Sequence, residues 1–544
     1  MENFNTTMNR IRIVFALLLC SVVLHAQAPP QNWFNLDPVA DKVNGVSTEK
    51  AYQELLSGRT SQKIIVAVID SGIDIEHEDL RDVVWINEDE IPDNGIDDDN
   101  NGYVDDVYGW NFIGGKDGQN VDKDTYEITR EYKRLRKIYE GKTADDFKKR
   151  ERAGFDYWLE VKETFERVSG EAQSQNMMLG NIDRQLRRYK KFFEAYLYTD
   201  EVTFQDIQKV QSTDEVVMMG KGMLTQLYTM IDTTMSLEVM IDLLSQDMEQ
   251  IAQDAEFRYN LDFEPRKVVG DNPDQLDEVG YGNNDVIGQG TDNFHGTHVA
   301  GIIAAKRGNN IGIDGVADNV QIMAIRAVPD GDERDKDVAN AIRYAVDNGA
   351  RVINMSFGKA YSPHTDYVYE AIEYAEKKGV LLVHAAGNSA EDIDEASNFP
   401  NDYIGRKADM ANWIEVGASS WGSEGNYVGN FSNYGKNNVD LFAPGVKIYS
   451  LAPGDEYKDA QGTSMASPVT SGVAALLLSY YPDLSADQVK DILMKSVRSL
   501  NDLTVSRPGT GEDVRFKELS VSGGIVNAYE AIKMAESMTM KGKK

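Results

Sequence analysis

Short, unbroken apolar runs recur along much of the chain, at residues 64–69, 320–325, 352–355, 380–383 and 414–416. Runs that are apolar on both sides are typical of strands in a parallel sheet whose two faces are covered by helices. Between these runs, residues 338–346 and 367–377 repeat apolar side chains at helical spacing, and Gly349 and Gly379 follow as helix-ending signals. The alternation predicts an α/β fold with a doubly wound, mostly parallel sheet and helices on both faces.

One long stretch breaks this alternation. No proline occurs between Pro92 and Pro265, and from about residue 122 the composition becomes charged and rich in methionine. Apolar residues follow helical spacing across 178–196 and again across 237–251. We therefore predict an inserted α-helical hairpin or bundle that folds semi-independently. The predicted boundaries are 116–264 for the insertion, 27–115 and 265–535 for one discontinuous domain, and 536–544 for a tail.

The N-terminal segment has the order of a secretory signal. Two arginines precede an apolar run at residues 13–24, and the small residue Ala26 follows. We predict a signal peptide at residues 1–26 that exports the protein to the periplasm or the extracellular space; its apolar run is too short to remain as a membrane span. The only cysteine, Cys20, lies in this segment, so the mature chain has no disulfide. A lipid anchor at Cys20 is disfavoured, because the residue before a lipidated cysteine is normally small and here it is Leu19.

The charge balance excludes two classes of partner. The formal net charge is −33, which repels nucleic acids and anionic membrane surfaces. No stretch after the predicted signal is long and apolar enough for a transmembrane helix, so we do not expect an integral membrane protein.

Four polar residues stand at the ends of predicted strands or at the starts of predicted helices. Asp70 ends the first apolar run, and Asn388 closely follows the run at 380–383. His295 and Ser464 each precede an apolar helix. A serine hydroxyl needs an adjacent base to act as a nucleophile, and the base needs an orienting group. Each residue alone also fits a structural role, as an N-cap, a core histidine or a turn residue, but the four together favour catalysis.

The segment around Ser464 suits a nucleophile for acyl transfer. The positive end of a helix favours developing negative charge. Pro468 fits the first turn of this helix, where its missing N–H removes no intrahelical bond. The side-chain amide of Asn388 and the backbone N–H of Ser464 can both donate to an oxyanion.

These motifs resemble those of the subtilisin-like serine proteases, or subtilases. The matching segments are 70–72, 295–301, 356–358, 386–388 and 462–468. The resemblance implies that Ser464 is the nucleophile, that His295 rather than His298 is the general base, and that Asp70 orients this base. It implies in the same way that Asn388 is the oxyanion donor.

The resemblance also implies where the substrate lies, and this sequence departs from the family pattern in two ways. It implies that the substrate backbone lies beside Ser356, Phe357 and Gly358. The first specificity pocket is then expected between these residues and a second segment that includes Ala386 and Gly387. Residues 27–63 are too few for the propeptide domain that assists folding in many secreted relatives, so maturation must differ. The predicted helical insertion is the second departure.

An acidic stretch at residues 97–106 suggests a calcium site. Oxygen-bearing side chains alternate, and a glycine stands at the sixth position, as in an EF-hand loop. The expected Ca²⁺ ligands are the side chains of Asp97, Asp99 and Asn101, the carbonyl of Tyr103, and Asp105 directly or through water. The twelfth position holds Tyr108 in place of the usual glutamate, so the loop alone leaves the site incomplete. The alternative is a solvated acidic turn.

The sequence thus predicts a secreted serine endopeptidase that hydrolyses a polypeptide substrate through an acyl-enzyme and needs no organic cofactor. Two alternatives stay open. One is a processing protease or exopeptidase whose helical insertion restricts access, and the other is a non-catalytic binding module on the same fold.

Overall fold

The computed structural model describes residues 29–288, 293–402, 410–422 and 427–542. The predicted signal peptide, Cys20 included, lies outside these residues. The described chain forms two compact units, a larger one made of Pro29–Arg134 with Leu261 onward and a smaller one made of Leu135–Asn260. The larger unit includes residues 116–134 and 261–264, which the sequence analysis placed in the insertion.

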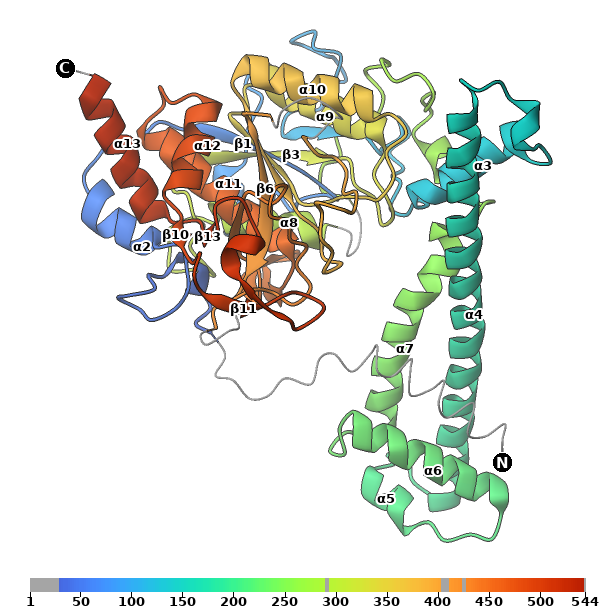
Figure 1. Cartoon of the computed structure of the whole chain (residues 1–544). Coiled ribbons are helices and arrows are strands. Elements are labelled where there is room, and N and C mark those ends of the chain that lie inside the picture. Colours follow the sequence, from blue (N-terminus) through green and yellow to red (C-terminus); the bar gives the residue numbers. More distant parts are fainter. Residues whose placement is uncertain (1–28, 289–292, 403–409, 423–426, 543–544) are drawn as a thin grey trace. The chain divides into compact units, whose positions relative to one another are not determined.

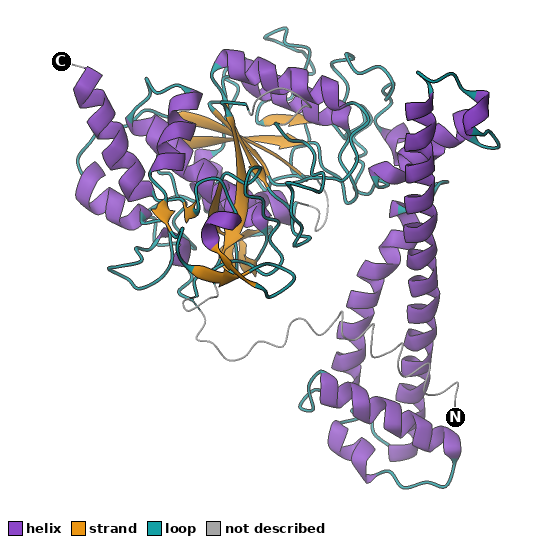
Figure 2. Ribbon diagram, viewed as in Figure 1, coloured by secondary structure: helices purple, strands orange, loops and turns teal. Residues whose placement is uncertain are grey.

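A nine-stranded sheet forms the centre of the larger unit, in the order β10-β13-β7-β6-β5-β4-β1-β3-β2 (Figure 2). All neighbouring strands are parallel except β10 and β13. The strands are β1 (Ile64–Asp70), β2 (Gly109–Asn111), β3 (Val320–Arg326), β4 (Val352–Met355), β5 (Leu381–Ala385), β6 (Trp413–Ser419), β7 (Leu441–Pro444), β10 (Arg498–Ser499) and β13 (Gly524–Ile525). Two antiparallel ribbons lie outside this sheet, β8 (Ile448–Ala452) with β9 (Glu456–Ala460) and β11 (Thr504–Ser506) with β12 (Asp513–Arg515).

Helices cover both faces of the sheet (Figure 1). Alternate residues of β1 belong to two separate cores, with Val66 and Val68 in one and Ala67 and Ile69 in the other. The first core is shared with α8 (Phe294–Ala304), α11 (Thr463–Tyr480), α12 (Ala486–Lys495) and α13 (Ala528–Gly542), and the second with α9 (Asp335–Asp347) and α10 (Thr365–Lys378). A short helix, α2 (Thr48–Ala51), precedes the sheet. The predicted α/β fold with a mostly parallel sheet is confirmed.

Helix α11 is buried along most of its length and differs from the prediction at one residue. Pro468 is the sixth residue of the helix, so it lies past the first turn. Its missing N–H leaves the carbonyl of Ser464, four residues earlier, without its usual donor. The hydroxyl of Ser356 donates to that carbonyl at 2.9 Å, so the orphaned acceptor is satisfied from β4's side of the site.

The smaller unit is entirely helical. Its longest helix, α4 (Arg152–Leu197), runs antiparallel to α7 (Leu237–Gln253), since Lys190 contacts Glu238 while Asp183 contacts Ser245. Two further helices, α5 (Phe204–Lys209) and α6 (Glu215–Met230), connect them, and α3 (Glu127–Tyr139) enters from the larger unit. An apolar core that includes Leu186 and Phe193 holds the unit together.

No helix in the described part of the chain combines the length and the apolar character needed to cross a bilayer.

Candidate active site

The carboxylate of Asp70 and the imidazole of His295 form a direct pair. Asp70 is the last residue of β1, and His295 is the second residue of α8. Oδ1 of Asp70 accepts a hydrogen bond from Nδ1 of His295 at 2.7 Å. Gly296 permits this approach, because a Cβ there would lie 2.3 Å from the carbonyl oxygen of Gly72 and 3.0 Å from Cβ of Asp70. The Asp70 side chain is buried, whereas the His295 side chain is 38% exposed.

This pairing changes the acid–base behaviour of His295. Burial lowers the pKa of the imidazole, but the charge of Asp70 and its hydrogen bond outweigh burial, so the pKa of His295 is raised above its ordinary value. The hydrogen bond also fixes the proton on Nδ1 and leaves Nε2 as the basic nitrogen.

The second histidine of the same motif has a different environment. His298 is fully buried, and its Nε2–H donates to the carbonyls of Ile448 and Lys458 at 3.1 and 3.0 Å. Burial lowers the pKa of His298 to about 4. The neutral ring therefore ties α8 to the β8–β9 ribbon.

Ser464 is the second residue of α11, and its contacts are with β4's end. Its Oγ donates to the carbonyl of Ser356 at 3.2 Å, while Oγ of Ser356 donates back to the carbonyl of Ser464. Among the described residues no hydrogen bond joins Ser464 to His295, although α8 and α11 pack against each other. The structure thus forms the Asp70–His295 hydrogen bond, while the hydroxyl of Ser464 is hydrogen-bonded to Ser356.

A cavity of about 340 Å³ opens beside Ser464. Its lining includes Ser356, Phe357, Gly358, Gly387, Asn388 and Ser464, which the sequence analysis singled out. Ala386 does not line it; the carbonyl of Ala386 accepts hydrogen bonds from Asn398 and Asn433. The structure therefore gathers most of the expected substrate-binding residues around one cavity that contains the serine.

The amide of Asn388 is oriented by the residue before the serine. Its Oδ1 accepts hydrogen bonds from the backbone N–H and the hydroxyl of Thr463, at 2.8 and 3.1 Å. Oγ1 of Thr463 in turn accepts the N–H of Gly387 at 3.0 Å. Because Oδ1 is used in this way, Nδ2 is the group that Asn388 can offer to a ligand.

Sequence reasoning missed three supporting residues. Thr463, within the serine motif, links the segments that carry Asn388 and Ser464. Asn433 holds the loop after Asn388, since its Oδ1 accepts the N–H groups of Ser389 and Glu391. His384 is fully buried and donates from Nε2 to the carbonyl of Phe357 at 2.7 Å. Adjacency to the serine could have identified Thr463, but the other two depend on contacts between distant segments.

A buried cluster of charges adjoins the cavity. Lys359, a lining residue, places Nζ 2.9 Å from Glu127 and 2.7 Å from Asp335. Glu333 also lines the cavity, and burial raises its pKa to about 7 against the opposing effect of Lys359. No motif in the sequence points to this cluster.

The geometry agrees with the outcome of comparison with known proteins. Residues 61–511 match the model of the subtilase family. The chain belongs to this family. It is 44% identical over 188 residues to a thermophilic serine proteinase of Bacillus sp. (strain AK1), a match that covers 34% of this chain and 43% of that protein. It is 39% identical to subtilisin DY of Bacillus licheniformis, over 39% of this chain and 72% of the relative, and 35% identical to thermitase of Thermoactinomyces vulgaris, over 44% and 75%.

Within this subtilase, side chains of the acidic loop accept hydrogen bonds from the loop's own backbone. Asp97 accepts the N–H groups of Asn101 and Gly102, and Asp105 accepts those of Asn94 and Gly95. Oδ1 of Asn101 accepts a hydrogen bond from the N–H of Tyr103. Several of the expected ligand oxygens thus accept backbone hydrogen bonds of the loop. Calcium binding by the predicted set stays a prediction.

Proposed function

We propose that this subtilase is a secreted serine endopeptidase. The observation that carries the proposal is the 2.7 Å hydrogen bond between Asp70 and His295, formed at the end of a buried strand and the start of a helix. A carboxylate that fixes the tautomer of an imidazole leaves Nε2 able to take a proton from a hydroxyl. Family membership and the cavity beside Ser464 support a polypeptide as the substrate.

In each half of the proposed reaction, His295 acts first as a base and then as an acid. His295 takes the proton from Oγ of Ser464 as this oxygen attacks the carbonyl carbon of the scissile peptide bond. The Oγ hydrogen bond to Ser356 is given up in this step. His295 then donates the proton to the leaving amine, and an acyl-enzyme remains. A water molecule, deprotonated by the same imidazole, attacks the ester, and the imidazolium returns this proton to Oγ of Ser464 as the acid product leaves, which restores the serine and the neutral base.

Charge develops on the substrate carbonyl oxygen during each attack. Nδ2 of Asn388 and the backbone N–H of Ser464 at the start of α11 are the donors proposed for this oxyanion. Asp70 keeps the proton on Nδ1 and stabilises the imidazolium. Extended substrate would lie along Ser356–Gly358, where the cavity is open beside the serine.

The test is digestion of an unfolded protein by the wild type and by Ser464→Ala. We expect many internal cuts with the wild type and a loss of about 10⁴-fold or more with the variant. Thermal unfolding of both proteins checks that the fold is retained. Trimming from the chain ends alone would favour an exopeptidase, and no cleavage by the wild type would favour a binding module. Activity of Ser464→Ala equal to the wild type would refute the assignment of the nucleophile.

Export is proposed from the signal-like N-terminus. Mass spectrometry of the protein recovered from the periplasm and the culture medium would locate the mature N-terminus. We expect it to follow Ala26, and recovery of the uncleaved chain from the cytoplasm alone would contradict export.

A further inference from the structure

One carboxylate at the cavity beside Ser464 has an oxygen without a hydrogen-bond partner. Glu333 lines this cavity and is 2% exposed. Its backbone carbonyl accepts hydrogen bonds from Nζ of Lys359 at 2.7 Å and from Nη2 of Arg130 at 3.3 Å. By contrast, Oε1 of its side chain is buried and has no hydrogen-bond partner within the described residues. A buried carboxylate oxygen without a donor is costly, and such atoms are rare in folded proteins.

The cations of the same buried cluster are engaged by other carboxylates. Among the described residues, Lys359 pairs with Glu127 and Asp335, Arg130 pairs with Glu127, and Arg334 pairs with Asp124. With Glu333 included, this cluster holds more carboxylates than cations. Burial raises the pKa of Glu333 to about 7, and attraction to Lys359 opposes burial only in part. A further cation beside this carboxylate would compensate its charge.

The rest of the described cavity lining supplies no unpaired positive charge. Lys359 is the only basic residue among the described lining residues, and its amine already pairs with Glu127 and Asp335. A second acidic residue, Glu391, also lines the cavity and is exposed. The cavity beside the candidate nucleophile is therefore acidic, and its most buried carboxylate lacks a partner.

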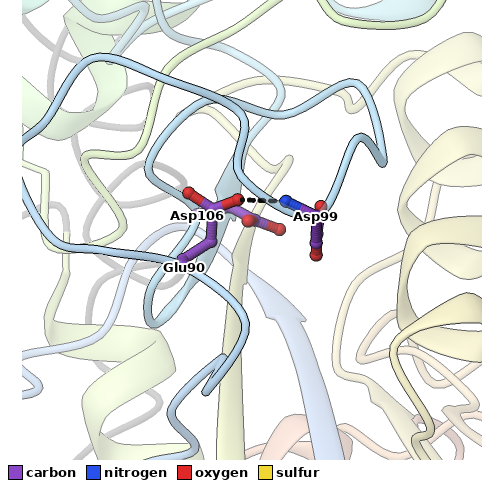
Figure 3. A group of neighbouring side chains, drawn as sticks. All are labelled: Glu90, Asp99 and Asp106. Carbon is purple, nitrogen blue, oxygen red and sulfur yellow. Dashed lines mark hydrogen bonds between the residues drawn. The ribbon is translucent and has the colours of Figure 1, made fainter.

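A different group of acidic residues in the larger unit shows that neighbouring carboxylates alone do not identify a substrate contact. Glu90, Asp99 and Asp106 each place an oxygen within 4.8 Å of the others (Figure 3). The side-chain amides of Asn87 and Asn101 both donate to Asp99 and to Asp106. None of these three acidic residues is among the described residues that line the cavity. Its position on the cavity beside Ser464 is what distinguishes Glu333.

We propose that Glu333 determines specificity by binding a positively charged group of the substrate. The proposal rests on the proposed peptidase function and names its substrate class: a polypeptide that presents a lysine side chain, an arginine side chain or its N-terminal amine to this carboxylate. Phe357 lines the same cavity, so the aliphatic part of a basic side chain can pack beside its ring. Charge attraction is strong where water is excluded, so this contact favours a cationic group over a neutral one.

The first experiment compares peptide substrates that differ only in charge, at a pH about one unit above the pKa of Glu333 so that its carboxylate is ionised. Each peptide carries lysine, arginine or norleucine at one position near the scissile bond, and each is made with a free and with an acetylated N-terminus. Norleucine keeps the aliphatic part of lysine without the amine. At one position we expect kcat/KM to be at least about tenfold higher for lysine or arginine than for norleucine. A gain of that size that requires the free N-terminus would identify the terminal amine as the bound group.

The second experiment tests the assigned carboxylate. Glu333→Gln keeps the shape of the side chain, and the preference for the cationic peptide should fall at least about tenfold. Glu333→Asp keeps the charge and should retain more of the preference than Glu333→Gln. The matched control is Glu391→Gln on the same cavity, which should lower the preference less than about fivefold because an exposed charge is screened by water. Thermal unfolding checks that each variant is folded.

Failure of this proposal and failure of the proposed function give different results. Cleavage of the norleucine peptide that disappears in Ser464→Ala supports a peptidase whatever the effect of charge. Equal kcat/KM of the wild type for all peptides would overturn the role of Glu333 alone, and this comparison needs no variant to fold. An unchanged preference in Glu333→Gln, or an equal loss in Glu391→Gln, would also overturn it. If the wild type cleaves none of the peptides, calorimetry with Ser464→Ala compares the binding of the lysine and norleucine peptides, and equal affinities would overturn the proposal.

Discussion

The interiors of the two units are built in different ways. Among the described residues of the smaller unit, Ser169 is the only buried side chain of the polar and charged type, and the core is formed by apolar side chains. The larger unit buries acidic, basic and amide side chains throughout, including Asp70, Arg326 and Lys359. A core of the first kind is specified by volume and periodicity, whereas one of the second kind requires a particular partner for each group.

Buried polar partners are concentrated where the chemistry is proposed. Arg326 lies opposite Asp70 in the parallel register of β1 and β3, and its Nε donates to the carbonyl of Ser71 at 2.6 Å. Its other end pairs with Asp122. The chain that follows Asp70 is thus held by a buried guanidinium. Contacts of a buried charged side chain therefore hold the chain at the candidate site. The described residues of the smaller unit include no buried charged side chain.

The largest expected effect is a loss of kcat when the buried carboxylate of Asp70 is replaced by an amide. Asp70→Asn keeps the shape of the side chain but removes the charge that stabilises the imidazolium and allows the wrong tautomer of His295. We expect kcat for a short chromogenic peptide to fall by about 10⁴-fold, with unfolding behaviour close to that of the wild type.

The matched control for this prediction is Glu76→Gln, an exposed carboxylate on the following segment. It should leave kcat unchanged. A fall of less than about tenfold in Asp70→Asn would show that the pair seen in the structure is not used in catalysis.

The second effect compares a buried ion pair with an exposed one. Burial lowers the pKa of Lys359, but Glu127 and Asp335 raise it beyond its ordinary value, so the amine is charged. Lys359→Ala leaves these carboxylates buried without their cation, and we expect a loss of about 3–5 kcal/mol in the free energy of unfolding. In the smaller unit Lys190→Ala, which removes a partly exposed pair with Glu238, should cost less than about 1 kcal/mol. Chemical denaturation of both variants measures the difference, and equal losses would contradict the contrast between the two cores.

The third effect concerns the apolar core. Leu186 is fully buried in the smaller unit, and Leu186→Ala should cost about 2–5 kcal/mol, depending on how far the cavity collapses. Because we predict that the unit folds semi-independently, this loss should appear as a separate, earlier unfolding transition in calorimetry. Hydrolysis of a short peptide should stay within about twofold of the wild type. The exposed Met177→Ala is the control. A single lowered transition with a parallel loss of activity would show that the two units are energetically coupled.

The sequence predicts the parts of this molecule that depend on local pattern. The apolar run that ends at Asp70 forms a strand where the pattern places it, whereas the helix predicted to follow His295 begins one residue before it, at Phe294. Pro468 was misplaced by one turn because the motif alone does not show where the helix begins. The compensating hydrogen bond comes from Ser356, more than a hundred residues away, and no local signal reports it.

Polar side chains without periodicity could not be placed in the same way. The partners of Lys359 and the contacts of Asn433 join segments that are distant in sequence. In the acidic loop the alternation singles out Asp97 and Asp105, and both carboxylates also accept backbone N–H groups of the loop. Which of several neighbouring carboxylates faces inward depends on the turns of the loop, and the spacing of the residues does not determine it.

The smallest expected effect is a shift in the pH dependence of activity. The base must be neutral to accept a proton, and the pKa of His295 is raised above its ordinary value by Asp70 despite partial burial. Protonation below this pKa removes the base, so kcat/KM should fall about tenfold for each pH unit on the acidic side and level off above it. Glu333, which lines the cavity, also titrates near neutrality, because burial raises its pKa to about 7. Glu333→Gln separates the two, since the acidic limb should persist in this variant if His295 causes it.

Imidazole titration by nuclear magnetic resonance in Ser464→Ala, with and without Asp70→Asn, measures the pKa of His295 directly. Removing the carboxylate should lower the pKa of His295, because burial then acts without the compensating charge. An unchanged pKa in the double variant would mean that the Asp70–His295 contact does not set the protonation of the base.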